Sequence, residues 1–319
     1  MSQRADKRPK ILVTGSDLAA QAISLLADFQ LIFSGGSYAN NDLIALAQQH
    51  DPVAVLVRYG GISDAVMQAA PSLKIIAKHG SGTDTIDKIA AAQRGIAVVA
   101  APGANAVAVA EHTLALLLAC AKSIVQLNDR MHAGHWDKAT HKSVELSGKT
   151  IGLIGLGAIG LRVAKLCHAL EMNVLGYDPF ACQLPNYVVQ VDLPDLWRRS
   201  YAISLHCPLT PQTKNIINAG SLAQCSKGLI LINTARGGLI DEPALLATIQ
   251  SGHVASAGID SYAQEPVIPP HPFAGKANFI LSPHIGGVSH EAYVNMGIAA
   301  AKNILEHMKQ KETRYENTL

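Results

Sequence analysis

The chain has 319 residues, a formal net charge of +2, 49% hydrophobic residues and 16% charged residues. This length allows two domains, and this composition favours a compact protein over a disordered one. The absence of a Lys/Arg block argues against nucleic acid as a partner, and the short, interrupted apolar runs argue against a signal peptide and a membrane partner.

Short β-branched runs alternate with helical stretches along the chain, a pattern typical of parallel α/β sheets. In the first hundred residues, we expect strands at 11–13, 53–57, 73–77 and 97–100. A long helix begins near Asn105 and leads to further expected strands at 151–154, 173–177, 202–206, 229–233, 255–259 and 279–281. A last helix is expected from 291 to about 309, returning to the first domain and making that domain discontinuous.

A glycine loop follows the expected strand at 151–154 and opens a helix. Gly155, Gly157 and Gly160 have the GxGxxG spacing, which suits a tight turn, close backbone approach to a pyrophosphate, and helix–strand packing. The helix N-terminus supplies N–H groups and partial positive charge for phosphates. Asp178 ends the next strand, where a carboxylate can bind the adenosine ribose and repel a 2′-phosphate. We predict NAD as the cofactor; the alternative is an ordinary glycine turn with a surface aspartate.

Three later residues form a candidate catalytic set. Arg236 follows the strand at 229–233 and precedes two glycines, and its planar guanidinium suits a carboxylate. His284 follows the last strand, and a carboxylate such as Glu265 beside it would stabilise its imidazolium. A His–Glu pair can deliver the proton that a carbonyl oxygen needs after hydride transfer. Each residue alone suits a surface role, but their order after a dinucleotide loop indicates catalysis.

The five cysteines are Cys120, Cys167, Cys182, Cys207 and Cys225, an odd number without CxxC spacing. We therefore expect free thiols in a reducing cytoplasm. A zinc site at His206 and Cys207 is disfavoured because neighbours in a strand point to opposite faces, so no metal is expected.

Over nearly its whole length, the sequence resembles the D-isomer-specific 2-hydroxyacid dehydrogenase family. The matching segments are 79–87, 102–106, 110–112, 148–150, the glycine loop, 206–210, the Arg236 segment, Asp260 with Glu265 and Pro266, and 283–287. The resemblance implies two Rossmann-like, doubly wound parallel-sheet domains around a cleft. Residues 1–104 and 288–319 would form a flavodoxin-like substrate-binding domain, and residues 105–287 an NAD-binding domain through which two copies form a homodimer.

The resemblance also implies residue roles. Arg236 would bind the substrate carboxylate, His284 would be the acid/base, and Glu265 would tune it. Substrate contacts are implied at Arg58, Lys78, Gly80, Ser81 and Gly82. Cofactor contacts are implied at Asn105, Gly155, Gly157, Ala158, Ile159, Gly160, Asp178, His206, Cys207, Pro208, Thr213, Thr234, Ala235, Arg236, Asp260, His284 and Gly287. Ala158 is a departure, since many members carry an arginine there that touches the pyrophosphate.

We therefore predict an NAD-dependent dehydrogenase of small D-2-hydroxy acids of the hydroxypyruvate, glyoxylate or 3-phosphoglycerate type. A formate dehydrogenase-like enzyme is disfavoured because that chemistry needs no proton transfer and pairs its histidine with glutamine instead of Glu265. A non-catalytic NAD-sensing protein similar to the related corepressors stays open, because those relatives keep the same catalytic set.

Overall fold

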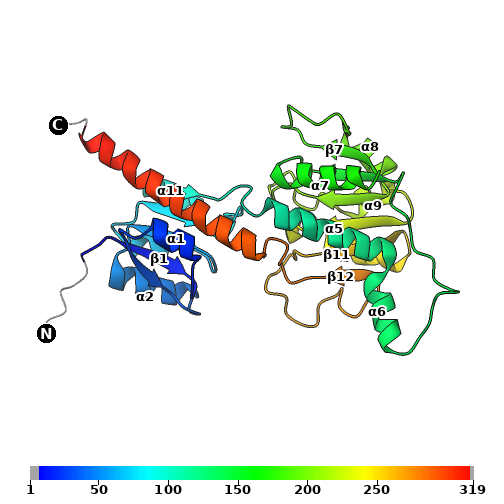
Figure 1. The fold of residues 1–319 in the computed structure, drawn as a ribbon, viewed down its shortest axis with the longest axis horizontal. Helices are drawn as coiled ribbons and strands as arrows, with labels where there is room; N and C mark the ends of the chain where they lie inside the picture. The colour runs from blue at the N-terminus through cyan, green and yellow to red at the C-terminus, as the bar shows by residue number, and fades with distance from the viewer. Residues whose placement is uncertain (1–6, 317–319) are drawn as a thin grey trace. The chain divides into compact units, whose positions relative to one another are not determined.

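The computed structural model of the chain describes residues 7–316, with side chains described through residue 309 (Figure 1). The chain forms two compact units: unit 1 is Met1–Asn105 with Ser289–Leu319, and unit 2 is Ala106–Val288. The domain boundaries expected from the sequence lie one residue earlier, so Asn105 belongs to unit 1 instead of the second domain. Residues 1–6 and 317–319 of the expected first domain lie outside the described residues.

Unit 1 is a parallel sheet covered by helices. Its elements are β1 (Lys10–Thr14), α1 (Ala20–Leu25), β2 (Gln30–Phe33), α2 (Asn40–His50), β3 (Ala54–Val57), α3 (Asp64–Gln68), β4 (Ile75–Lys78), α4 (Lys88–Gln93), β5 (Ala97–Val99) and α11 (His290–Glu316). Its strands lie in the order β2-β1-β3-β4-β5. Figure 1 shows α11, in orange and red, running beside α1.

Side chains that alternate in direction along the strands divide the core of unit 1 between the two faces of its sheet. Ile11 and Val13 of β1 pack with Ala300 and Ile304 of α11, whereas Leu12 packs in the cluster on the other face. Successive side chains of a strand point to opposite faces, so an apolar strand needs helices on both sides. This requirement explains why the last helix of the chain completes the unit that the first strand begins.

Unit 2 is a larger parallel α/β unit. Its elements are α5 (Ala106–Lys122), α6 (Ile124–His132), β6 (Thr150–Ile154), α7 (Ala158–Ala169), β7 (Asn173–Tyr177), β8 (Val188–Gln190), α8 (Leu193–Arg199), β9 (Ala202–Leu205), α9 (Ala219–Gln224), β10 (Leu229–Asn233), η1 (Gly237–Leu239), α10 (Glu242–Gln250), β11 (Val254–Ile259) and β12 (Phe279–Leu281). The strand order is β12-β11-β10-β9-β6-β7-β8. The predicted fold class, two parallel α/β domains, is confirmed.

The strand order of unit 2 reverses direction at β6. The chain first moves from β6 outward to β7 and β8, then returns to β9 on the other side of β6. In open α/β sheets, ligands bind outside the carboxyl ends of the strands at such a switch point. The fold therefore directs attention to the loops that follow β6 and its neighbours.

No single helix within residues 7–316 has both the length and the apolarity needed to cross a membrane. Among the described helices, α5 and α6 pass that test by length and composition when taken together, as a pair bent by 62°.

Candidate active site

The glycine loop after β6 has the backbone of a dinucleotide loop. Gly155 has φ +96, and a Cβ there would lie 2.6 Å from the backbone of His206 and Cys207. A Cβ on Gly160 would lie 2.1 Å from the carbonyl oxygen of Gly155, so helix and loop touch only because residue 160 is glycine. Space for a ligand is left at Gly157, where an added Cβ meets nothing within 4 Å.

Helix α7 begins directly after this loop, with Gly157 as its N-cap. No side chain caps the helix, and its first turn contains no acidic residue. The first backbone N–H groups of a helix lack partners within the helix and carry partial positive charge. The loop and α7 therefore fit the pyrophosphate of a dinucleotide, with backbone groups as the donors.

Asp178 follows β7 and lies against the glycine loop. One carboxylate oxygen accepts the N–H of Leu156 at 2.8 Å, and the other accepts the N–H of Phe180 at 2.9 Å. These bonds hold a negative charge beside the loop, and each oxygen keeps a further lone pair for another donor. The position suits the ribose contact expected from the sequence.

The cofactor residues expected in unit 2 gather at one edge of its sheet. They follow β6 (Gly155, Gly157, Ala158, Ile159, Gly160), β7 (Asp178), β9 (His206, Cys207, Pro208, Thr213), β10 (Thr234, Ala235, Arg236), β11 (Asp260) and β12 (His284, Gly287). All these strands are parallel, so their carboxyl ends share that edge.

Burial lowers the pKa of His206 to about 3, so this histidine is neutral and bonds Ser204 at 2.9 Å.

His284 and Glu265 are hydrogen-bonded to each other. Nδ1 of His284 lies 2.6 Å from Oε2 of Glu265, and Oε1 of Glu265 accepts the N–H of Tyr262 at 2.9 Å. An ionised carboxylate only accepts, so Nδ1 carries the proton and Nε2 is left for a ligand. The hydrogen bond with Glu265 outweighs burial and raises the pKa of His284. Burial alone would raise the pKa of Glu265, but the hydrogen bonds from His284 and Tyr262 outweigh it and lower that pKa.

Arg236 lies close enough to this pair to influence both of its charges. Its positive charge lowers the pKa values of Glu265 and His284, as a secondary contribution in each case. The close packing depends on Gly237, where a Cβ would lie 1.8 Å from the carbonyl carbon of Tyr262. The structure thus brings the three predicted catalytic residues together, and the first glycine after Arg236 lets the two loops touch.

Asp260 anchors the loop that carries His284, a role that the sequence did not indicate. Its carboxylate is 1% exposed and accepts the Oγ–H of Ser282 at 2.6 Å and the N–H groups of Ile285 and Gly286 at 2.9 and 2.8 Å. His112 completes the cluster, with Nε2 2.9 Å from Ser282 Oγ. These bonds fix the backbone on both sides of His284, which has φ +55. The matched segments contained these residues except Ser282, but their contact links positions far apart in the sequence.

The expected substrate residues belong to unit 1, at the carboxyl edge of its sheet. Arg58 follows β3, Lys78 ends β4, and Gly80, Ser81 and Gly82 form the turn after β4. Gly80 has φ +143, a conformation that favours glycine. The hydroxyl of Ser81 lies 3.0 Å from Oδ1 of Asn105, the one expected cofactor residue in unit 1.

Comparisons with known proteins agree with this geometry. Residues 114–286 match the model of the D-isomer specific 2-hydroxyacid dehydrogenase family, NAD binding domain. A D-3-phosphoglycerate dehydrogenase of Archaeoglobus fulgidus is 44% identical over 260 residues, which cover 80% of this chain and 49% of that protein. The chain belongs to the D-isomer specific 2-hydroxyacid dehydrogenase family.

Other members of the family are similar over more of their own length. A hydroxypyruvate reductase of Thermotoga maritima is 42% identical over 247 residues, which cover 76% of this chain and 80% of that protein. A crystal structure of a Thermus thermophilus protein has 33% identity and a TM-score of 0.87, covering 94% of this chain and 97% of that one. The chain spans about half the length of the curated D-3-phosphoglycerate dehydrogenases that it matches.

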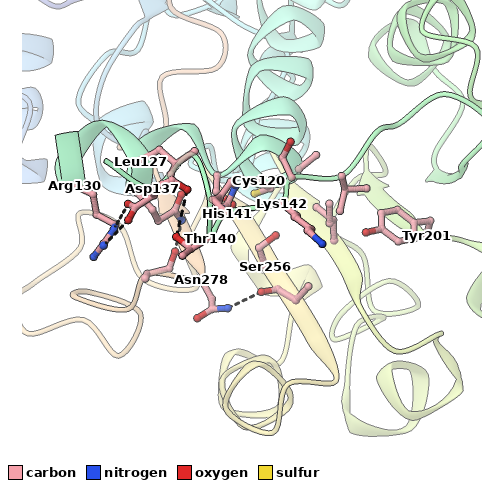
Figure 2. Close-up of a pocket in the computed structure, with 18 residues that line it drawn as sticks. Cys120, Leu127, Arg130, Asp137, Thr140, His141, Lys142, Tyr201, Ser256 and Asn278 are labelled. Atoms are coloured by element: carbon pink, nitrogen blue, oxygen red, sulfur yellow. Dashed lines mark hydrogen bonds and ion pairs between the residues drawn. The ribbon is translucent and has the colours of Figure 1, made fainter. Parts of the chain in front are cut away.

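A pocket of about 520 Å³ with a mixed polar and apolar lining lies elsewhere in unit 2 (Figure 2). Its lining includes Tyr201, Ile230, Ser256 and Asn278, which lie at or just before the amino ends of β9 to β12. Figure 2 also shows Cys120 in the lining, and burial raises the pKa of its thiol to about 11. The predicted catalytic residues follow the carboxyl ends of the same strands, so this pocket is separate from the candidate active site.

Proposed function

We propose that this protein is an NAD-dependent dehydrogenase that interconverts small D-2-hydroxy acids and 2-oxo acids. One observation carries the proposal: His284 is bonded to Glu265 at 2.6 Å beside Arg236, at the sheet edge that bears the glycine loop. NAD supplies or accepts the hydride when it is bound. The protein's residues hold the substrate and move a proton.

His284 exchanges the proton of the substrate oxygen through Nε2. In the reducing direction, the carbonyl oxygen gains negative charge as the hydride arrives, and a protonated imidazole delivers the proton it needs. Glu265 holds Nδ1–H and stabilises the imidazolium, which keeps His284 protonated to a higher pH. In the oxidising direction, the neutral imidazole takes the hydroxyl proton.

Arg236 binds and orients the substrate carboxylate through its guanidinium. Two parallel N–H bonds fix a carboxylate in one plane, which sets the direction from which the neighbouring carbon is approached. In unit 1, we assign substrate contacts to Arg58, Lys78 and the turn of Gly80, Ser81 and Gly82. Ser81 is exposed and Gly82 is half-buried, which supports that assignment.

NAD is the proposed form of the cofactor, in preference to NADP. The carboxylate of Asp178 lies against the glycine loop, where an NADP 2′-phosphate would bring a second negative charge. The uncapped start of α7 and the glycine cradle support binding of the shared pyrophosphate.

The proposed 2-oxo acid is hydroxypyruvate, glyoxylate or 3-phosphohydroxypyruvate, the last of which corresponds to 3-phosphoglycerate as the hydroxy acid. The relatives above are named for phosphoglycerate and hydroxypyruvate, which supports this range. Formate chemistry is disfavoured because a hydride leaves formate without proton exchange, whereas Glu265 prepares His284 for proton exchange. A non-catalytic NAD sensor is the second candidate, since such a protein can keep the same residues.

The proposed contact between the two copies of a homodimer lies on unit 2. Its helix α6 and the segment after it expose apolar side chains, including Ile124, Met131 and Trp136, which is 74% exposed. Exposed apolar clusters of this kind are typical of protein–protein contacts.

The cytoplasm is the proposed location, because all five cysteines lie within the described residues as free thiols and four of them are buried.

Initial rates of NADH oxidation test the proposal, with glyoxylate, hydroxypyruvate, phosphohydroxypyruvate and pyruvate as substrates. We expect saturable turnover with at least one of the first three acids. NADH binding, followed by fluorescence, without turnover of any acid would favour the sensor. No binding and no turnover would contradict both candidates.

A further inference from the structure

Asp17 and Arg58 form an ion pair at the carboxyl edge of the unit 1 sheet. Asp17 follows β1 and Arg58 follows β3, the strand that pairs with β1. Nη1 of Arg58 is ion-paired with Oδ1 of Asp17 and also donates to the Asp17 carbonyl. The side chain of Arg58 is 9% exposed and that of Asp17 is 64% exposed, so the pair presents mainly its carboxylate to solvent.

Two tyrosines hold the guanidinium of Arg58 in place. Its central carbon lies 5.1 Å from the ring centroid of Tyr59 and 4.9 Å from that of Tyr293, distances at which a cation is attracted to a ring. The hydroxyl of Tyr293 also donates to Oδ2 of Asp17 at 3.1 Å. Both members of the ion pair are therefore fixed by the first turn of α11.

The backbone around the pair is equally well defined. The hydroxyl of buried Thr14 accepts the N–H groups of Arg58 and Tyr59 at 3.0 and 3.2 Å and donates to the Tyr59 carbonyl at 2.7 Å. Gly15 leaves room for the guanidinium, because a Cβ there would lie 3.3 Å from Nη1 of Arg58. Arg58 is thus held in place by its neighbours and is not a solvated surface side chain.

The charges around Arg58 favour an uncharged hydroxyl over a phosphate at this site. The hydrogen bond from Arg58 outweighs burial and lowers the pKa of Asp17, so its carboxylate is ionised at neutral pH. Lys78 donates to the Arg58 carbonyl at 3.3 Å and adds a positive charge, while burial lowers the pKa of His79 to about 4 and leaves it neutral. A phosphate at this site would meet an exposed carboxylate and an arginine that is already paired. A hydroxyl can instead donate to the Asp17 carboxylate.

We propose that Asp17 is a specificity-determining residue that selects the end of the substrate remote from the carboxylate. It neutralises Arg58 and offers an acceptor, so the site takes a 2-oxo acid with an uncharged hydroxyl on C3 and rejects one whose C3 oxygen is phosphorylated. This inference rests on the proposed function and on the assignment of Arg58 to the substrate.

The test compares kcat/KM for three acids in the parent protein and in Asp17→Asn. Glyoxylate has no C3 group, so it reports the chemistry without the distal contact. We expect the parent to favour hydroxypyruvate over phosphohydroxypyruvate by about tenfold or more, and Asp17→Asn to reduce that ratio by about tenfold, the scale of one altered charge contact. Turnover of glyoxylate should stay within about twofold of the parent, because no distal contact is involved.

Asp64→Asn is the matched control, since Asp64 also pairs with an arginine of unit 1, Arg94, at 2.7 Å. We expect its substrate ratio to equal that of the parent. If Asp17→Asn folds poorly, as judged by its melting temperature, Asp17→Ser removes the same charge and is judged by the same ratio.

The failures of the two proposals are distinguishable. A parent that prefers phosphohydroxypyruvate, or an unchanged ratio in a folded Asp17 variant with normal glyoxylate turnover, overturns the inference and leaves the dehydrogenase standing. Loss of glyoxylate turnover in both folded Asp17 variants also overturns it, because the residue would then act beyond the distal end. A parent that reduces none of the acids overturns the proposed function itself.

Discussion

His284 illustrates how one neighbouring residue prepares a side chain for proton exchange. An isolated imidazole is half protonated near pH 6.5, so it is a weak acid source at neutral pH. The hydrogen bond between Nδ1 and Glu265 raises the pKa of His284, and it also leaves Nε2 as the nitrogen that the proposed substrate would meet. The same contact therefore supplies both the protonation state and the orientation.

Glu265→Gln should move the pH dependence of the reaction. Reduction requires protonated His284, so its rate falls as pH rises through the pKa of His284. Glutamine removes the anion that raises this pKa, so the fall should move to lower pH. Oxidation requires neutral His284, so its acid-side limb should also move to lower pH.

Profiles of kcat/KM against pH in both directions measure this change. Glu145→Gln, which alters an exposed glutamate of unit 2, should leave both profiles unchanged. Profiles of Glu265→Gln that coincide with those of the parent would show that Glu265 does not tune His284.

Arg236→Lys should reduce activity more than its conserved charge suggests. Lysine keeps the positive charge but cannot form two parallel bonds to a carboxylate, so the substrate loses its orientation. We expect kcat/KM to fall on the order of a hundredfold, a cost typical of misplaced reacting groups. Arg198→Lys, at an exposed arginine of α8, serves as the control. A value for Arg236→Lys within about twofold of the parent would place Arg236 outside the substrate site.

At the scale of elements, β6, the glycine loop and α7 form the part of unit 2 that fits a dinucleotide. Gly155 and Gly160 allow contacts that no side chain would permit, and the start of α7 provides uncapped N–H groups. Asp178 at the end of β7 adds a negative charge beside this loop. We therefore expect β6, α7 and β7 together to determine which cofactor is accepted.

Asp178→Asn should weaken the discrimination between NADH and NADPH. Asparagine keeps an acceptor for the Leu156 N–H but removes the charge that repels a 2′-phosphate. We expect the ratio of kcat/KM for NADH to that for NADPH to fall by about tenfold, mainly through KM for NADPH. Asp195→Asn on α8 is the control. An unchanged ratio would leave Asp178 as a residue that only holds the glycine loop.

Sequence patterns predicted the elements that local residue types determine. The strands on both sides of the glycine loop were expected because β-branched runs end in Gly or polar residues. The strands β2 and β8 were not expected. Each lies at an edge of its sheet. β8 has three residues of which only Val188 is buried, so its apolar signal is weak, whereas β2 does contain an apolar run, Leu31–Phe33, that the prediction missed.

The candidate site was predictable where spacing along the chain reveals it. The glycine loop and the order of Arg236, Glu265 and His284 are of that kind. The pair of Asp17 and Arg58 is separated by 41 residues and is joined only through the pairing of β1 with β3. The bonds of Asp260 to the His284 loop span 25 and 26 residues. Contacts of this type depend on tertiary structure and have no local signature.

At the scale of the molecule, the chain builds two units from one recurring plan of parallel strands and covering helices. The last helix, α11, returns to unit 1 and supplies Tyr293 to the clamp around Arg58 as well as apolar residues to the core. Both termini of the described chain therefore belong to the same unit. Unit 2 is a continuous segment that carries His284, Glu265 and Arg236.

The proposed homodimer predicts an effect at the exposed apolar surface of unit 2. Trp136→Glu should shift the protein toward the mass of one chain in light scattering after size exclusion, because a charge is costly in a buried contact. Ile89→Glu alters an equally exposed apolar residue of unit 1 and should leave the mass at that of two chains. A parent that elutes with the mass of one chain would contradict the homodimer.

The central claim is that His284 provides the proton for hydride transfer to a 2-oxo acid. Single-turnover oxidation of bound NADH by glyoxylate, in the parent and in His284→Ala, tests it most directly. We expect the variant still to bind NADH and to react about a hundredfold to ten-thousandfold more slowly, the usual cost of losing a general acid. An unchanged single-turnover rate in His284→Ala would contradict the claim.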